Sequence, residues 1–333
     1  MEYAKTMIEG LELSRVGLGT WGMGGGSYWG DPEEDRAIKT IHAALDMGIN
    51  VVDTAAVYGL GRSEEIVGKG LSQAGYRKKA ILATKCGLSW DAQGNVYRDS
   101  RPATIRREIE DSLKRLQTDY IDIYQIHWAD KRVPIAETAS VMLDLMKEGK
   151  IRAIGVSNMS NDQMDEWRKT APLHTLQPSF NILENKLFEN QIPYAQKNNL
   201  AVLGYSSLCR GLLTGKYYVG MDTKELAMRA QEDQKFQGQN FVNHVAAVDE
   251  LKEYAVQFGK TVAQLAVRWV LDRGVTCALW GVTKEEHLGP VSGVLGWHLT
   301  EEQMDEMERI VAKHIPVQVG KEFLVPPFRE VCV

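Results

Sequence analysis

Four side chains of complementary acid–base character follow short apolar segments of the chain. Asp53 closes the segment VVD, Tyr58 comes five residues later, and Lys85 and His127 each follow another apolar run. A tyrosine phenol has a pKa of about 10, so it transfers protons at neutral pH only when a neighbouring charge assists. Lys85 can supply that charge, Asp53 can hold Lys85 in place, and His127 can hydrogen-bond a substrate oxygen. This set would protonate a carbonyl oxygen or deprotonate an alcohol. Because no side chain donates hydride, a nicotinamide cofactor is implied.

The elements that must bring these residues together are predicted as alternating strands and helices. Short apolar runs are typical of parallel strands covered on both sides, and we predict eight of them at 16–18, 51–53, 80–84, 121–126, 151–156, 175–177, 201–204 and 277–279. The intervening segments have helical spacing at 33–46 (behind an Asp31–Pro32 start), 64–69, 103–116, 134–148, 162–169, 245–258 and 262–272.

Eight strands alternating with helices fit a doubly wound sheet or a (β/α)8 TIM barrel. Eight is the number that closes a barrel, and no Pro/Gly/Ser-rich linker divides the chain, so we expect one barrel domain over 1–333. We also expect an N-terminal β-hairpin, with TMI and LEL around Glu9–Gly10, and a long seventh connection from Tyr205 to about Thr276, which is often a lid. After the last strand we expect a helix start at 284–288, an extra helix at 301–312 and an extended tail over 314–333.

The stretch from Gly17 to Gly22 satisfies the pattern G-x-G-x-x-G of dinucleotide-binding loops. That function needs a helix to open at the glycines, but the chain continues as MGGGSYWGDP, which does not start one. We therefore interpret the stretch as the first loop at a barrel mouth. In a barrel the active site lies at the carboxyl ends of the strands. There the sequence places, besides the four residues above, Ser157–Asn158, Gln177 and Tyr205–Ser206.

Composition restricts the partners of the chain. It has 333 residues, 44% hydrophobic and 25% charged, with a net charge of −5, which argues against general nucleic-acid binding or an anionic membrane surface. The four cysteines form no CxxC pair, so neither a metal site nor a disulfide framework is expected. The N-terminus has no apolar h-region and no run is long enough to span a membrane. We expect a cytoplasmic protein that is a monomer or a weak homo-oligomer.

The sequence resembles the aldo-keto reductase family over almost its whole length. The resemblance rests on the segments VGLGTWGMG, GINVVDTAAVYGLGRSEEIVGKGL, ILATKCGL, RREIEDSLKRLQTDYIDIYQIHW, LMKEGKIRAIGVSNMS, QPSFNIL, LGYSSLCRGLLTGKY and VAQLAVRWVL. Within the family it is most similar to the bacterial branch that reduces glyceraldehyde and oxidises small polyols, through LGYSSLCRGLLTGK, CALWGVTK and the proline-bearing C-terminus.

The resemblance implies roles for individual residues. The catalytic set is Asp53, Tyr58, Lys85 and His127, with Tyr58 as general acid/base. The nicotinamide carboxamide is held by Ser157, Asn158 and Gln177, and Tyr205 stacks on the nicotinamide ring. The segment with Ser206, Leu208 and Gly211 lies along the pyrophosphate, and Gly19, Thr20 and Trp21 touch cofactor and substrate.

The end of the eighth strand departs from the family pattern. Many relatives have Gly-Ala-Arg there and a later Glu-Asn pair, whereas this chain has Gly281-Val-Thr-Lys284, then His287, and then Pro290-Val291. Lys284 and His287 near a helix start suit an adenosine 2′-phosphate, so we expect NADPH to be preferred over NADH. The alternative is that both are solvated. For the substrate pocket we expect aromatic residues beside the same loops, namely Trp21, Tyr28, Trp29, Trp90 and Trp128.

The expected function is an NADP-dependent reductase of small aldehydes and ketones that reversibly oxidises polyols. Two alternatives remain at this point. The first is a nicotinamide-binding accessory subunit of the same superfamily with little turnover, because fold and cofactor alone do not guarantee activity. The second is a barrel aldolase with Lys85 as a Schiff-base nucleophile. Asp53 disfavours the aldolase, because an ion-pair partner keeps the lysine protonated.

Overall fold

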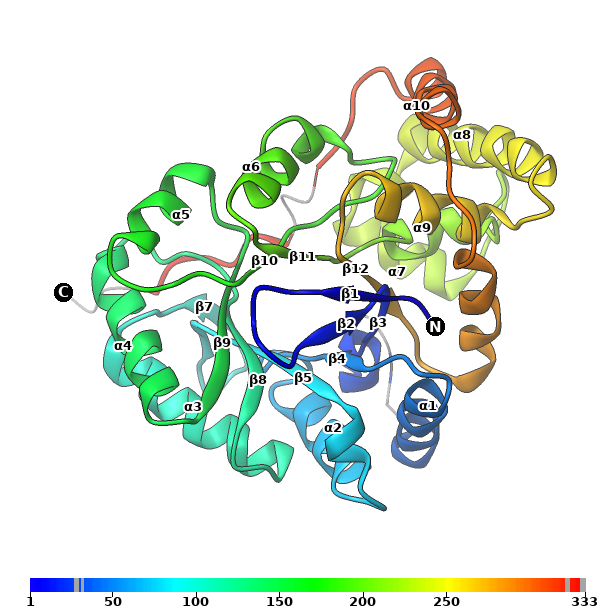
Figure 1. Cartoon of the computed structure of the whole chain (residues 1–333). Helices are drawn as coiled ribbons and strands as arrows, with labels where there is room; N and C mark the ends of the chain where they lie inside the picture. Colours follow the sequence, from blue (N-terminus) through cyan, green and yellow to red (C-terminus); the bar gives the residue numbers. More distant parts are fainter. Residues whose placement is uncertain (27–29, 31–32, 321–323, 330–333) are drawn as a thin grey trace.

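Eight parallel strands close into a barrel surrounded by helices, and the doubly wound alternative is excluded (Figure 1). The computed structural model describes residues 1–26, 30, 33–320 and 324–329. Around the barrel the strands follow the order β10-β11-β12-β3-β4-β5-β8-β9. Their bounds are β3 Val16–Gly19, β4 Val51–Asp53, β5 Ile81–Cys86, β8 Ile121–Ile126, β9 Ile151–Ser157, β10 Thr175–Gln177, β11 Ala201–Gly204 and β12 Cys277–Gly281. All eight predicted strands are present.

Alternation along each strand separates an inner from an outer layer. On β5, Ile81 and Ala83 belong to the hydrophobic cluster inside the barrel, whereas Leu82 and Cys86 belong to the larger one beneath the helices. Lys85 therefore points inward and Cys86 outward, as the sequence predicts. The same alternation turns Asp53, at the end of β4, toward the barrel axis.

The helices around the barrel largely match their predicted positions. Their bounds are α1 Glu34–Asp46, α2 Arg62–Leu71, α3 Pro102–Leu116, α4 Ile135–Lys147, α5 Asn161–Arg168, α6 Gln191–Lys197, α7 Lys224–Glu232, α8 Gly238–Val256, α9 Val262–Asp272 and α10 Glu301–His314. Capping boxes start three of them, from Ser160, Thr261 and Thr300. Helix α1 begins at Glu34, one residue after the predicted start at 33, and the Asp31–Pro32 start that the sequence predicts lies outside the described residues.

The N-terminal hairpin is present, but its first strand lies earlier than predicted. β1 (Tyr3–Lys5) pairs with β2 (Glu12–Ser14) in antiparallel register, so the segment TMI belongs to the connecting loop. Figure 1 shows this hairpin across one end of the barrel. Leu11 and Leu13 join the inner hydrophobic cluster there. The hairpin therefore closes the end of the barrel opposite the carboxyl ends of the strands and leaves those ends for chemistry.

The two long C-terminal segments are more ordered than predicted. The seventh connection contains α7 within its polar stretch, and α8 begins at Gly238 rather than at 245. Helix α10 continues through His314, so the tail starts later than predicted. The described part of the tail is held by two connections outside the barrel strands. Gly320 O accepts from Lys235 Nζ of the seventh connection at 3.2 Å, and Pro327 O accepts from Arg98 N at 2.9 Å. Among the described residues, no helix is long and apolar enough to cross a membrane.

Candidate active site

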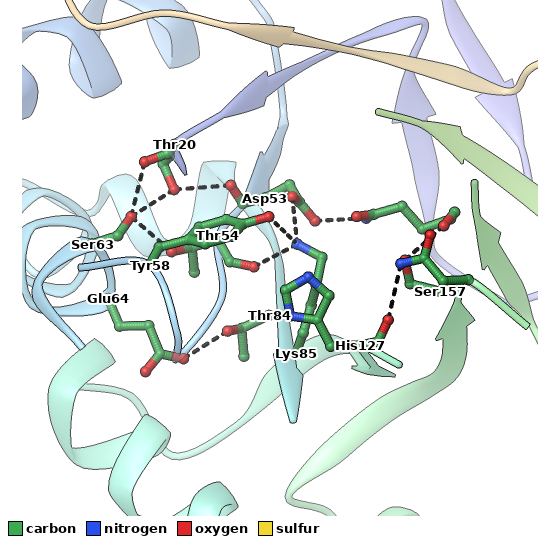
Figure 2. Close-up of polar contacts among 12 residues, drawn as sticks. Thr20, Asp53, Thr54, Tyr58, Ser63, Glu64, Thr84, Lys85, His127 and Ser157 are labelled. Carbon is green, nitrogen blue, oxygen red and sulfur yellow. Dashed lines mark hydrogen bonds and ion pairs between the residues drawn. The ribbon is translucent and has the colours of Figure 1, made fainter. Parts of the chain in front are cut away.

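Asp53, Tyr58 and Lys85 meet at the carboxyl end of the barrel (Figure 2). The Lys85 Nζ donates to Asp53 Oδ2 at 2.7 Å, to the Thr54 carbonyl at 2.8 Å and to Tyr58 OH at 3.3 Å. These three acceptors use all three ammonium hydrogens. Because the Tyr58 oxygen accepts from Lys85, its own proton is available to a further acceptor in the mouth of the barrel.

Burial and charge set the protonation states of this group. Burial alone would lower the pKa of Lys85, but the neighbouring Asp53 and Tyr58 outweigh it and raise that pKa, so the ammonium stays charged. Burial raises the pKa of the Tyr58 phenol above its usual value, while the Lys85 charge opposes that rise. The phenol is therefore protonated at neutral pH, which suits an acid.

His127 completes the group as a neutral imidazole. Its ring lies edge-on to the Tyr58 ring, with the centroids 5.9 Å apart. Burial, and then the Lys85 charge, holds the pKa of His127 well below its usual range. A neutral imidazole donates a hydrogen bond to a carbonyl oxygen without competing for the proton of Tyr58. The structure thus brings together all four residues predicted to be catalytic.

The three amide and hydroxyl residues predicted to hold a carboxamide lie beside this group. Gln177 Nε2 donates to Asp53 Oδ1 at 2.8 Å, and Ser157 Oγ donates to the Gln177 carbonyl at 2.7 Å. Asn158 Nδ2 donates to the His127 carbonyl and to Ser157 Oγ, while Asn158 Oδ1 accepts from Tyr205 OH at 2.9 Å. One network therefore joins the acid–base group to the ends of β9, β10 and β11.

The first loop packs directly against the Tyr58 loop. Thr20 Oγ1 donates to the Asp53 carbonyl at 2.9 Å, and the Trp21 ring centroid lies 6.2 Å from that of Tyr58. Gly59 has φ +59°, and a Cβ there would lie 2.0 Å from Gly24 O. The glycines of this region thus permit close backbone packing, and the chain after Gly19 forms a short 3-10 helix (Trp21–Gly24) rather than opening the α-helix of a dinucleotide-binding loop.

The predicted aromatic pocket is only partly defined. Trp21 lies beside Tyr58, and Trp128 directly follows His127 and lies beneath the Arg98 guanidinium at 5.2 Å. Trp90 ends β6 (Leu88–Trp90), which forms a hairpin with β7 (Val96–Arg98), and its place in a pocket stays a prediction. Tyr28 and Trp29 lie outside the described residues.

The segment after β11 has an unusual backbone. Ser206, Cys209, Arg210 and Gly211 all have positive φ, and Leu208 precedes the short helix 209–214. Such conformations are costly for non-glycine residues and cluster at ligand-binding segments. Ser206, Leu208 and Gly211 thus share one tightly coiled loop, and their place along a pyrophosphate stays a prediction.

Cationic groups gather beyond the end of β12. Lys284 is the residue before a 3-10 helix, η6 (Glu285–Val294), and Gly281 is exposed with open space where a side chain would be. Partial burial lowers the pKa of His287, and the charges of Lys284, Lys216 and Arg36 lower it further. The carboxylate of Glu286 has the opposite effect. Positive charge from three segments therefore converges on this corner.

Sequence reasoning missed several residues that support the site. Ser63 and Glu64 open α2 behind Tyr58 and hydrogen-bond Thr54 and Thr84, the neighbours of Asp53 and Lys85. The only sequence feature that could have indicated their role is the polar Ser-Glu pair at the start of an amphipathic segment. Within the described ranges, no group of three or more His, Cys, Asp or Glu residues is placed to hold a metal ion.

The barrel and the grouped acid–base residues define the class of protein, an oxidoreductase of the carbonyl-reducing kind. The Aldo/keto reductase family matches residues 15–312, and the chain belongs to that family. Aldo-keto reductases use nicotinamide cofactors.

Named relatives cover nearly the whole chain. The aldo-keto reductase YhdN of Bacillus subtilis (strain 168) is 48% identical over 99% of both proteins. The NADH-specific methylglyoxal reductase of Escherichia coli (strain K12) is 35% identical over 87% of this chain and 92% of that protein. The structure of the glycerol dehydrogenase AKR11B4 from Gluconobacter oxydans superposes with a TM-score of 0.88 and 47% identity, over 97% of this chain and 99% of that one. The similarity to the bacterial polyol branch is thus confirmed.

Proposed function

We propose that this protein is an NADP-dependent reductase of small, glyceraldehyde-like or sugar-derived aldehydes and ketones that also oxidises polyols in the reverse direction. The observation that carries the proposal is the Tyr58 hydroxyl, which accepts a hydrogen bond from the buried Lys85 and keeps its own proton for a substrate oxygen. The similarity to a glycerol dehydrogenase supports the polyol direction.

Each member of the group has a distinct task in this reaction. Tyr58 gives its proton to the carbonyl oxygen during reduction, and Lys85 stabilises the negative charge that remains on the phenol oxygen. Asp53 keeps Lys85 charged and fixes its direction. The neutral His127 donates a hydrogen bond to the same substrate oxygen and so orients the carbonyl. A bound nicotinamide would supply the hydride in reduction and accept it in oxidation.

The residues at the strand ends fit a nicotinamide nucleotide. A carboxamide has both donor and acceptor groups, and Ser157, Asn158 and Gln177 offer the complementary set. Tyr205 offers a ring face beside them. The coiled segment with Ser206, Leu208 and Gly211 and the first loop with Gly19, Thr20 and Trp21 would border the phosphates and the ring. These assignments rest on position in the barrel and on the donor set.

A preference for NADPH is supported by the cationic corner beyond β12. An adenosine 2′-phosphate carries negative charge that Lys284, Lys216 and Arg36 would offset, although Arg36 already pairs with Glu286 at 3.6 Å. The pKa of His287 is lowered, so its neutral imidazole would contribute a hydrogen bond and not a charge. The Escherichia coli relative is named for the opposite preference. A direct comparison of NADPH with NADH therefore decides between the two preferences.

The proposal is tested by following cofactor consumption with glyceraldehyde, with NADPH and NADH compared at equal concentration. We expect turnover with both and a higher kcat/KM with NADPH. A higher kcat/KM with NADH would agree with a reductase but would contradict the assignment of Lys284 to a 2′-phosphate site. If cofactor binds but a panel of aldehydes, ketones and polyols gives no turnover, the proposal is wrong and the accessory-subunit alternative replaces it.

Lys284→Ala should weaken NADPH binding about tenfold and leave NADH binding nearly unchanged. A hydrogen bond between charged groups contributes about 1.5–3 kcal/mol, and about 1.4 kcal/mol corresponds to a tenfold change in Kd. Fluorescence titration with both cofactors measures the difference. Lys79→Ala is a matched control, because it removes the same charge at an exposed lysine that pairs with Asp46. Equal losses of affinity for the two cofactors would show that Lys284 does not bind the 2′-phosphate.

A further inference from the structure

Two consecutive polar residues at the start of α2 are completely buried directly behind the acid–base group. Ser63 and Glu64 both have an exposed fraction of 0%, which is unusual for a carboxylate in particular. Their side chains point away from solvent and toward the ends of β3, β4 and β5, as Figure 2 shows. Buried polar groups are stabilising only when they are hydrogen-bonded, so their partners indicate what they do.

Ser63 ties the Tyr58 loop to the ends of β3 and β4. Its backbone N–H donates to the Tyr58 carbonyl at 3.1 Å. Its Oγ accepts from Thr54 Oγ1 at 2.9 Å and donates to the Thr20 carbonyl at 3.0 Å. The Thr54 carbonyl is itself the acceptor for Lys85 Nζ. One serine therefore fixes both the backbone that carries the phenol and the residue that aims the ammonium group.

Glu64 holds β5, the strand that carries Lys85. Its Oε1 accepts from Thr84 Oγ1 at 2.6 Å, and Thr84 immediately precedes Lys85 on β5. Its Oε2 accepts from Arg115 Nε at 2.7 Å, which compensates the buried charge. Thr84 points outward where Lys85 points inward, so Glu64 holds β5 from behind the lysine.

The contact that these residues control is sensitive to small displacements. Lys85 Nζ lies 3.3 Å from Tyr58 OH, just beyond the 2.7–3.2 Å that is usual for such a hydrogen bond. A shift of a few tenths of an ångström would break or strengthen it. Neither Ser63 nor Glu64 belongs to the group predicted to touch substrate or cofactor.

We propose that Ser63 is a positioning residue for proton transfer by Tyr58, and that Glu64 supports it by holding β5. This inference rests on the proposed function for its consequence in catalysis. It concerns the Lys85–Tyr58 contact, which exists whether or not the protein turns over any particular substrate. A brace that only stabilised the fold would leave the protonation of Tyr58 unchanged.

The test follows the ionisation of Tyr58 in Ser63→Ala. Tyrosine labelled with ¹³C at Cζ gives one signal per ring, and the Tyr58 signal is the one lost in Tyr58→Phe. Without the Ser63 hydroxyl, the Lys85–Tyr58 contact should lengthen and the phenol pKa should rise by about one unit, because less positive charge opposes the effect of burial. We expect kcat to fall about tenfold and the Kd of the cofactor to stay within about twofold.

A matched control is Thr138→Ala, because the Thr138 hydroxyl of α4 is also buried and also donates to a loop carbonyl, that of Ser100, at 3.1 Å. It should change the melting temperature and not the Tyr58 titration. Thr54→Val removes the same link from the other side with the shape preserved, and it replaces Ser63→Ala if that variant does not fold.

The results separate this inference from the proposed function. If Ser63→Ala and Thr54→Val lose stability while Tyr58 titrates as in the wild type, Ser63 is a structural brace only and the inference is overturned. If no carbonyl substrate is ever reduced, the proposed function fails, but the titration still decides the positioning role. If the titration moves in these variants and not in Thr138→Ala, the inference stands.

Discussion

Replacing Tyr58 with phenylalanine should lower kcat for carbonyl reduction by about a thousandfold and leave the Kd of the cofactor unchanged. A positioned general acid contributes about 10²–10⁴ to a rate, and this variant removes the transferable proton while it keeps the ring. The Trp21 and His127 contacts of that ring are made by its edges and faces, so they persist. Steady-state rates and a cofactor titration by fluorescence measure both parts of the expectation.

The matched control for this change is Tyr124→Phe. Tyr124 is a fully buried tyrosine on β8 that lies in the hydrophobic layer between the strands and the helices, and so faces away from the barrel axis. It should keep full activity. Normal turnover in Tyr58→Phe would show that another group supplies the proton, and a loss confined to cofactor binding would show that the hydroxyl holds the cofactor and does not transfer the proton.

In the proposed reaction, the protonation of Tyr58 also separates reduction from oxidation. Burial raises the pKa of the phenol, so the acid form that reduction needs persists through neutral pH. Oxidation of an alcohol needs the phenolate as base, and its population increases as the pH rises toward that pKa. The free enzyme is thus better prepared for reduction near neutrality, and the charge on Lys85 limits how large the difference becomes.

The barrel and its acid–base group could be predicted because both follow from local signals. The segment Ile121–Ile126 is buried on both sides, and its apolar composition predicts a parallel strand without knowledge of the rest of the fold. Once eight such strands close a barrel, their carboxyl ends must share one mouth. Residues as distant in sequence as Asp53 and Lys85 then meet without any further information, and here they form an ion pair of 2.7 Å.

Elements that depend on tertiary contacts were not predicted from the sequence. Helix α6 (Gln191–Lys197) is short and contains Pro193, and α7 (Lys224–Glu232) is a short helix within a polar stretch. The β6–β7 hairpin turns at Asp91, whose carboxylate accepts from the backbone N–H groups of Gln93 and Asn95. Arg98 donates to the carbonyls of Pro326 and Ala129. These residues are distant from Arg98 in the sequence, so the spacing of residue types does not predict the contacts.

Replacing Lys85 with methionine should abolish turnover and also destabilise the fold. Asp53, only 3% exposed, would lose the cation that offsets its buried charge. Removing one partner of a buried ion pair costs about 3–5 kcal/mol of the free energy of unfolding. We expect kcat to fall about a thousandfold or more, because Lys85 no longer stabilises charge on Tyr58. Urea denaturation and steady-state rates measure the two effects.

The double variant Asp53→Asn/Lys85→Met separates stability from chemistry. The neutral amide introduced at position 53 can still accept from Gln177 Nε2, which in the wild type donates to Asp53 Oδ1 at 2.8 Å, and no uncompensated charge remains. The double variant should therefore recover most of the lost free energy of unfolding and stay inactive. Equal stability of the single and double variants would mean that water reaches Asp53 when Lys85 is absent. Recovered activity would mean that Tyr58 transfers its proton without a neighbouring cation, and the role given to Lys85 would be wrong.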